Sequence, residues 1–182
     1  MIEIVPWQSL AEPETVKAAI ERIFFAASGT QVFASEAARS VFCERWLGRY
    51  LDHDPGHVFV ARAGSGQIVG YLVGSCDDPA RTQRFADIGF FAQFSQLTRA
   101  YPAHLHVNLD ANARAGGIGS ALVEAFCQQV ATAGLPGVHV VTGRGVRNVG
   151  FYERLAFVER GAATFNGREI VFLGRELAGQ RL

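Results

Sequence analysis

The sequence is poor in cysteine, carries no excess of either charge and has no long apolar run, and each scarcity excludes a class of protein. Its three cysteines, Cys43, Cys76 and Cys127, are widely spaced without a C-x-x-C pair, so neither a disulfide framework nor a zinc or dithiol centre is expected. Lys and Arg number 17, and so do Asp and Glu. Such a balance lacks the basic surface that attracts nucleic acids and anionic membranes. We therefore expect no metal, no nucleic acid and no membrane partner.

Targeting and linker segments are also missing from the sequence. No apolar stretch approaches the roughly 18 residues that cross a bilayer. The segment from Met1 to Trp7 has no basic flank before an apolar stretch, unlike a secretory signal, so a cytoplasmic location is expected. The 182 residues are 49% hydrophobic and contain no low-complexity tract. They predict one folded domain over residues 1–182 with a sizeable core.

The spacing of apolar residues predicts alternating strands and helices. A first strand at 2–5 precedes helices over 12–27 and 35–50, the second with Ser35 as N-cap and an apolar stripe that includes Val41. Strands over 57–62 and 67–76 form a hairpin. The aromatic stretch 84–100 is an interrupted helix or a lid. Further segments are a strand at 104–110, a helix at 117–133, a strand at 138–142, a helix at 146–155, and strands at 157–160 and 169–173 around Asn166-Gly167.

The clearest functional signal is the turn between the strand at 104–110 and the helix at 117–133. It reads Arg114-Ala115-Gly116-Gly117-Ile118-Gly119-Ser120, with glycines where backbone N–H groups can approach a ligand without a Cβ in the way. The first helical turn and the helix dipole both favour an anion there. The turn has neither the ending of a P-loop nor the glycine order of a Rossmann fingerprint. It predicts another kind of phosphate cradle, or a tight turn without a ligand.

A wider pattern connects this turn with a known family. Arg-x-x-Gly-x-Gly at 114–119 follows an apolar strand and precedes the segment Asn148-Val149-Gly150-Phe151-Tyr152-Glu153-Arg154-Leu155-Ala156-Phe157. The combination resembles the GCN5-related N-acetyltransferase (GNAT) superfamily. The stretch from Tyr101 to Val107 is similar to the acetyltransferase-like domain attached to some O-GlcNAc hydrolases and to its free-standing bacterial relatives. The resemblance implies an α/β single-domain GNAT-like fold, a twisted mixed β-sheet flanked by helices with a splayed central strand pair.

The resemblance also implies acetyl-CoA as co-substrate and N-acetyltransferase, hence acyltransferase, activity. The pyrophosphate would lie over the backbone of Arg114, Ala115, Gly116, Gly117, Ile118, Gly119 and Ser120. Other cofactor contacts would come from Val107, Asn108, Leu109, Asn148, Phe151 and Tyr152. The Tyr152 hydroxyl would lie near the sulfur and donate a hydrogen bond to the departing thiolate. Simple packing of the Tyr152 ring is the alternative.

Two positions depart from the family pattern. Gly145 lies seven residues before Tyr152, where relatives often have an asparagine, so one CoA contact is expected to be missing. Leu155-Ala156-Phe157 replaces the usual Leu-Gly-Phe, which puts Ala156 in a turn and predicts a slightly altered backbone.

A proton acceptor for the amine is the least defined part of the predicted site. Deprotonating a lysine-like amine, with a pKa of about 10.4, at pH 7 costs about 4.6 kcal/mol, so a base or a water chain would matter. His104, His106, Asn108 and Asp110 share one face of the strand at 104–110. His106 and Asp110 are the candidate catalytic bases, and a hydrogen-bonding histidine and a turn aspartate are their structural alternatives. Asn108 cannot act as a base.

Several questions stay open at the level of sequence. The acceptor is an amine of a small molecule or of a protein, and its selectivity is expected in the first two helices and before the central strand. A homodimer is left open because aromatic residues at 85–94 would be exposed, although buried packing of the same residues is the alternative. The alternative function is a CoA-binding module without transferase activity, acting as a sensor or partner platform. A glycine-rich nucleotide-binding fold ranks last.

Overall fold

The computed structural model describes residues 1–114 and 116–177, which form two compact units. The first unit contains Met1–Ser75 and His106–Phe126, and the second contains Cys76–Leu105 and Cys127–Leu182. The strands form a seven-stranded mixed sheet in the order β1-β2-β3-β4-β5-β7-β6. Strand β4 (Ala103–Leu109) begins in the second unit and ends in the first. The predicted α/β class with a mixed sheet is confirmed.

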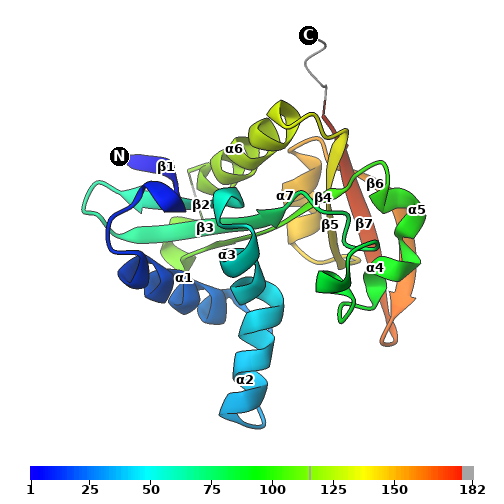
Figure 1. Ribbon diagram of the computed structural model, residues 1–182, viewed down its shortest axis with the longest axis horizontal. Coiled ribbons are helices and arrows are strands. Elements are labelled where there is room, and N and C mark those ends of the chain that lie inside the picture. Colours follow the sequence, from blue (N-terminus) through cyan, green and yellow to red (C-terminus); the bar gives the residue numbers. More distant parts are fainter. Residues whose placement is uncertain (115, 178–182) are drawn as a thin grey trace. The chain divides into compact units, whose positions relative to one another are not determined.

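The first unit is built on an antiparallel meander of three strands (Figure 1). Strand β1 (Ile2–Pro6) pairs with β2 (Val58–Ala63), which pairs with β3 (Ile68–Ser75). Gly66, with φ of 87°, turns the chain between β2 and β3, so the predicted hairpin is confirmed. Short 3-10 turns occupy Trp7–Ser9 (η1) and Pro55–His57 (η3), and the second of these delays the start of β2 by one residue.

Two helical segments of the first unit follow β1. Helix α1 (Pro13–Ala27) begins with proline at a position that needs no hydrogen-bond donor, and it buries Ile20, Ile23 and Phe24. The next segment begins as α2 (Glu36–Cys43), where the Ser35 side chain accepts a hydrogen bond from the Ala38 amide at 3.1 Å, as predicted. It continues through the π-helical η2 (Glu44–Gly48) into α3 (Arg49–His53).

The buried residues of this helical segment begin within the π-helical turn. A π turn holds one residue more than an α turn and therefore rotates everything after it. Helix α2 buries none of its residues, and Val41 is 59% exposed, so the predicted apolar stripe is wrong at Val41. After η2 begins, Leu47, Tyr50 and Leu51 are buried. Figure 1 shows α2 extending away from the strands of its unit.

Helix α6 (Ile118–Thr132) follows β4 and the 3-10 turn Ala111–Ala113 (η5). Leu122, Val123 and Phe126 are fully buried. They recur at helical spacing, which is the pattern that predicted this helix.

The strands of the second unit form parallel and antiparallel ladders. Strand β5 (Gly137–Gly143) pairs in parallel with β4 at Ala103↔Val138 and His104↔His139, at the start of both strands. It pairs antiparallel with β7 (Arg168–Glu176), which pairs with β6 (Val158–Phe165). Asn166 and Gly167 both have positive φ, as the predicted hairpin requires. Both closing strands are longer than predicted.

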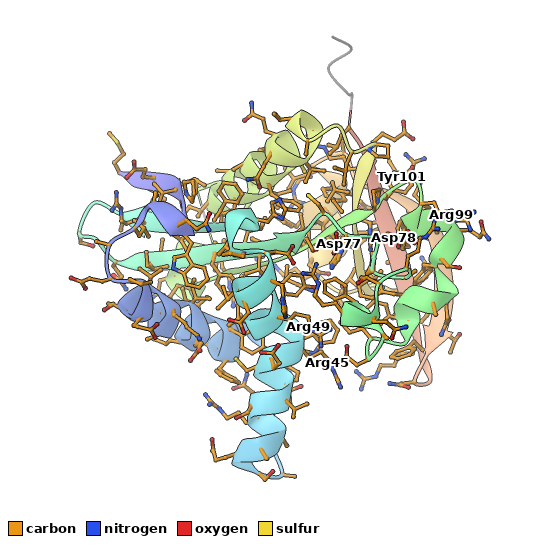
Figure 2. All side chains as sticks on the ribbon, in the orientation of Figure 1. Arg45, Arg49, Asp77, Asp78, Arg99 and Tyr101 are labelled. Carbon is orange, nitrogen blue, oxygen red and sulfur yellow. The ribbon has the colours of Figure 1, made fainter. Side chains whose placement is uncertain are left out.

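Two glycines in neighbouring strands make room for one aromatic ring. A Cβ at Gly137 or Gly174 would lie 2.6 Å or 2.9 Å from the Tyr101 ring, which therefore rests directly on the backbone of β5 and β7. The hydroxyl of Tyr101, which is labelled in Figure 2, donates to Glu176 at 3.3 Å, and the rings of Tyr101 and Phe172 are in contact, with centroids 6.0 Å apart. This contact fixes the chain immediately before β4.

The aromatic stretch before β4 is packed inward. It forms the 3-10 turn Gln83–Phe85 (η4) and the short helices α4 (Phe90–Gln93) and α5 (Ser95–Thr98). Phe85, Phe91 and Phe94 are all at most 3% exposed, so the alternative of buried packing is confirmed for these three rings, and Phe90 is half-buried. Within the described ranges no helix combines the length and apolar character needed to cross a bilayer.

Candidate functional site

The glycine turn before α6 has the backbone geometry of an anion cradle. Gly116 and Gly117 have φ of 89° and 76°, a pair of left-handed conformations that any other residue adopts only with strain. A Cβ at either position would meet nothing within 4 Å, so the space beside the turn is open. The amides of Ile118, Gly119 and Ser120 form the first turn of α6, where an α-helix supplies no acceptor. Ala115 lies outside the described residues.

His106 occupies an aromatic slot in the first unit. Its Nε2 lies 3.2 Å from the hydroxyl of Tyr50. The rings of Tyr50 and Trp46 both meet the imidazole edge to face, with centroids 5.4 Å and 5.5 Å away. Burial lowers the pKa of His106 to about 4, so the imidazole is neutral at pH 7. A neutral imidazole keeps one nitrogen as an acceptor.

The other polar residues of this strand face are held by protein partners as well. The Asn108 amide donates to the Tyr71 hydroxyl at 2.8 Å, and burial raises the pKa of Tyr71 above its usual range. Asp110 forms an ion pair with Arg22 at 2.9 Å, and its carbonyl accepts from the Ala113 amide. The side chain of Leu109 fills the space over Gly70. Val107 is half-buried on the opposite face of the strand.

His104 belongs to the second unit and is a core residue. It is 2% exposed and its ring packs against Phe85 and Phe91, with centroids 4.7 Å and 5.4 Å away. These are the contacts of a structural residue in the core, which is the alternative to a catalytic role for His104.

Tyr152 is fixed by the end of its own helix. Helix α7 (Asn148–Glu153) is shorter than predicted and ends in a Schellman motif, in which the Phe157 amide donates to the Tyr152 carbonyl and the Ala156 amide to the Glu153 carbonyl. Ala156 has φ of 63°, the left-handed conformation that glycine usually adopts at this position of the motif, so the predicted turn at Ala156 is confirmed. The Tyr152 and Phe157 rings pack with centroids 5.3 Å apart, the apolar contact that accompanies this motif.

The hydroxyl of Tyr152 is left without a protein partner within residues 1–114 and 116–177, although the side chain is only 6% exposed. Burial raises the pKa of Tyr152 above its usual range, so the phenol stays protonated. A protonated hydroxyl with no protein acceptor can donate to a ligand. Phe151, half-buried, meets the Tyr152 ring edge to face at 5.0 Å.

The turn between β5 and α7 explains the departure at Gly145. Gly145 has φ of 74°, a conformation that glycine and asparagine tolerate best, so the turn survives while the asparagine side chain is missing. The side-chain oxygen of Asn148 accepts a hydrogen bond from the Thr142 hydroxyl at 3.0 Å, and this contact does not use the side-chain N–H groups of Asn148. Arg144 is held by ion pairs with Glu159 and Glu169.

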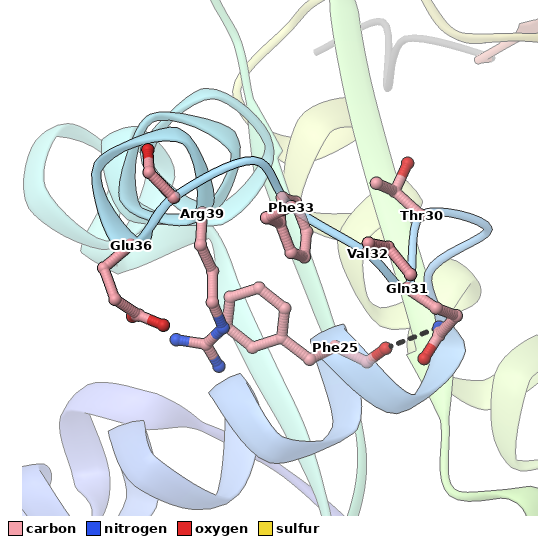
Figure 3. A pocket seen from close by; sticks show the side chains of 8 residues that line it. Phe25, Thr30, Gln31, Val32, Phe33, Glu36 and Arg39 are labelled. Atoms are coloured by element: carbon pink, nitrogen blue, oxygen red, sulfur yellow. Dashed lines mark hydrogen bonds between the residues drawn. The ribbon is translucent and has the colours of Figure 1, made fainter.

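A cavity of about 410 Å³ lies between the end of α1 and the start of α2 (Figure 3). The Arg39 guanidinium stacks on the Phe25 ring at 3.6 Å, and Gln31 donates to the Phe25 carbonyl at 3.1 Å. Phe33 and Glu36 also line it. The cavity therefore combines aromatic surface with one cationic and one anionic side chain, on the two helices where acceptor selectivity is expected.

Comparison with known protein families gives this architecture a name. The family model described as the acetyltransferase (GNAT) family matches residues 19–157, which include β4, the glycine turn and α7. The chain belongs to the GNAT family. Members of this family are acetyltransferases, and the match supports transferase activity at that general level.

Solved structures agree with the GNAT fold along nearly the whole chain. SsHAT is 22% identical, with 97% of this chain and 98% of that chain covered and a TM-score of 0.72. The NatC complex bound to Gag peptide and CoA is 15% identical, with 97% and 99% covered and a TM-score of 0.66. Ard1 from Thermoplasma volcanium is 18% identical, with 97% and 98% covered and a TM-score of 0.60. Identities this low establish the GNAT fold alone.

The predicted site residues divide between the two units of this GNAT chain. The first unit holds the residues of β4 from His106 onward and the glycine turn, and the second holds Asn148, Phe151 and Tyr152. Sequence reasoning missed the partners Tyr50, Tyr71 and Arg22 altogether. Only the i, i+4 spacing of Trp46 and Tyr50 signalled that these two rings share a helix face. Within residues 1–114 and 116–177, no group of three or more His, Cys, Asp or Glu side chains is arranged to hold a metal ion.

Proposed function

We propose that this GNAT protein transfers the acetyl group of acetyl-CoA to the amine of an acceptor by direct attack. The observation that supports the proposal most is the open turn at Gly116 and Gly117 before α6, inside the segment that matches the family. Two left-handed glycines followed by the first-turn amides of a long helix suit a diphosphate. The cradle residues would therefore bind the pyrophosphate of CoA mainly through the backbone.

The chemistry needs a proton acceptor for the amine, a donor to the carbonyl oxygen and a donor to the leaving thiolate, and the first and the last of these roles would fall to His106 and Tyr152. The acceptor nitrogen attacks the thioester carbonyl carbon, the C–N bond forms, the C–S bond breaks, and the thiolate of CoA leaves. Tyr152 would donate a hydrogen bond to that thiolate. Because burial raises the pKa of Tyr152, full proton transfer to a thiolate is uphill, and the phenol stabilises the leaving group as a hydrogen-bond donor.

The proton that the amine loses would go to His106 rather than to Asp110. Asp110 is engaged by Arg22 at 2.9 Å, whereas neutral His106 retains an acceptor nitrogen. A base whose conjugate acid has a pKa of about 4 cannot deprotonate an alkylammonium efficiently before the attack on the thioester. His106 therefore acts as the C–N bond forms, when the nitrogen becomes more acidic, and it passes the proton on to solvent.

Two measurements on the full chain test the proposal. Acetyl-CoA is first added in a thermal-shift titration, with NAD and ATP as comparison ligands, and stabilisation by acetyl-CoA alone is expected. Release of free CoA thiol is then followed with a panel of small amines, amino sugars and peptides carrying a lysine or a free N-terminus. Acceptor-dependent thiol release supports the transferase. Binding without thiol release for any acceptor class identifies a CoA-binding module instead, and stabilisation by NAD or ATP rejects both.

A further inference from the structure

The position of His106 depends on the helical turn η2. Trp46 lies within η2, and Tyr50 follows in α3 with no exposed surface. Because Trp46 and Tyr50 are four residues apart and share one face of the helix, both rings contact the imidazole, which is held by two rings and one hydroxyl. Arg45, next to Trp46, and Arg49, next to Tyr50, are labelled in Figure 2 and mark this stretch of helix. Such a slot fixes both the plane and the rotation of the ring.

The two nitrogens of His106 are in different situations. Nε2 lies 3.2 Å from the Tyr50 oxygen. Nδ1 has no hydrogen-bond partner among residues 1–114 and 116–177, and the side chain is half-buried. The hydrogen bond of one ring nitrogen decides which nitrogen of a neutral imidazole carries the proton. The nature of the Tyr50 contact therefore decides whether Nδ1 accepts or donates.

We propose that Tyr50 is a positioning residue that sets the tautomer of His106 for acetyl transfer. The His106 Nε2–H donates to the Tyr50 oxygen, so the Nδ1 lone pair is free to take the proton of the acceptor amine. This inference rests on the proposed function. The balance is simple: one N–H bond of the amine breaks as the C–N bond forms, the proton moves to Nδ1, and the imidazolium then releases it to water. Tyr50 touches neither substrate and acts only through His106.

The surroundings of the imidazole agree with this role. Desolvation is the cause that lowers the pKa of His106, and no charged side chain contributes to the shift. The ring contacts of the imidazole within the described residues include the Tyr50 phenol from α3 and the Trp46 indole from η2, and neither is charged at neutral pH. The ring thus enters the reaction neutral. After it accepts a proton, the imidazolium has a pKa of about 4, so at pH 7 it loses the proton to water without help from another side chain.

The tautomer can be measured without any activity. In full-length protein labelled with 15N-histidine, two-bond 1H–15N correlations distinguish a protonated Nε2 from a protonated Nδ1, and the His106→Gln variant assigns the signals among the five histidines. We expect a single neutral Nε2–H tautomer at pH 7. In Tyr50→Phe, which keeps the ring but loses the oxygen, a mixture of both tautomers is expected. A wild-type His106 protonated on Nδ1 overturns the proposal.

Kinetics provide the second arm. Tyr50→Phe should lower kcat about five- to ten-fold while the KM for acetyl-CoA stays unchanged, because the cradle is untouched. Tyr101→Phe is the matched control: it also loses one hydroxyl hydrogen bond, to Glu176, and should keep wild-type turnover. Unchanged kcat in Tyr50→Phe overturns the positioning role alone, whereas absence of thiol release from the wild type overturns the proposed function and the role together. If Tyr50→Phe does not fold, the wild-type tautomer decides.

Discussion

The polar side chains of β4 and the hydroxyl of Tyr152 are treated in opposite ways by the fold. His106, Asn108 and Asp110 each have a protein partner, from α3, β3 and α1 respectively. Tyr152 has its carbonyl bound by the Phe157 amide, but within residues 1–114 and 116–177 nothing accepts from its hydroxyl. The described part of the chain thus fixes the position of Tyr152 through the backbone and makes no hydrogen bond to its hydroxyl.

This difference suggests how to separate groups that hold the fold from groups kept for a ligand. A buried polar group with a partner contributes about 1 kcal/mol to stability, and its removal leaves the partner unsatisfied. A polar group without a protein partner contributes little to stability, so its substitution should affect binding or turnover instead. By this criterion the glycine turn at Gly116 and Gly117, like the Tyr152 hydroxyl, is expected to serve a ligand. The hydrogen-bonded pair Tyr71 and Asn108 is expected to stabilise the fold.

The largest expected effect comes from Gly117→Val. The new side chain occupies the open space beside the cradle, so acetyl-CoA affinity should fall at least 100-fold in calorimetric titration. The variant also pays about 1–2 kcal/mol for a left-handed non-glycine residue. Gly66→Val carries the same backbone strain, at φ of 87° with nothing within 4 Å of the Cβ, in the β2–β3 turn. Normal acetyl-CoA affinity in Gly117→Val would show that the turn at Gly116 and Gly117 does not bind the pyrophosphate.

A second effect concerns the pH dependence of stability. His106 has a pKa of about 4 in the folded chain against 6.5 as its ordinary value, so between these values the unfolded chain binds more protons. Titration of His106 therefore leaves the free energy of unfolding unchanged above pH 6.5. As the pH falls below 6.5, the free energy of unfolding decreases, by about 3 kcal/mol at pH 4. Urea unfolding of wild type and His106→Gln between pH 4 and 7 measures it. Equal slopes in the two proteins would mean that His106 is not desolvated.

The sequence anticipated those features that depend on neighbouring residues. The Gly116-Gly117 turn, the Ser35 cap, the Asn166-Gly167 hairpin and the strained Ala156 each follow from local backbone chemistry. The partners of β4 could not be predicted, because Tyr50, Tyr71 and Arg22 are distant in sequence and reach β4 only through tertiary packing. The π turn at Glu44–Gly48 has no local sequence signal; the buried residues Leu47 and Tyr50 lie within and after it, whereas Val41 in the preceding α2 is exposed.

Tyr152→Phe should separate function from stability most directly. Loss of the donor to the thiolate should lower kcat ten-fold or more, equivalent to about 1.4 kcal/mol, with acetyl-CoA affinity nearly unchanged. Because the hydroxyl has no partner among the residues that the structure describes, the melting temperature should stay within about one degree of the wild type. Tyr101→Phe, which loses its bond to Glu176, is the control with the opposite expectation of slightly reduced stability and full turnover. Wild-type turnover of Tyr152→Phe at saturating substrates would reduce Tyr152 to a packing residue.

The Asn108–Tyr71 hydrogen bond tests the partnered side of the comparison. Tyr71 has no exposed surface, so Asn108→Leu strands its hydroxyl and should cost about 1–3 kcal/mol, and Tyr71→Phe should cost about 1 kcal/mol. In the double variant neither group is left unsatisfied. Urea unfolding of the four proteins should therefore give a coupling of about 1 kcal/mol. Strict additivity would show that the bond does not contribute to stability, and Asn108 would then join the groups available to a ligand.

Ala156→Gly should have the smallest effect, and its sign is informative. Glycine removes about 1 kcal/mol of left-handed strain at φ of 63°, but it costs about 0.4–1 kcal/mol by loosening the unfolded chain, so a net gain of a few tenths of a kcal/mol is expected. Ala162→Gly on the extended and exposed part of β6 relieves no strain and should lose about 0.5–1 kcal/mol. Equal losses in both variants would mean that the Schellman turn is absent, and Tyr152 would then lose the backbone anchor that makes an unpartnered hydroxyl useful.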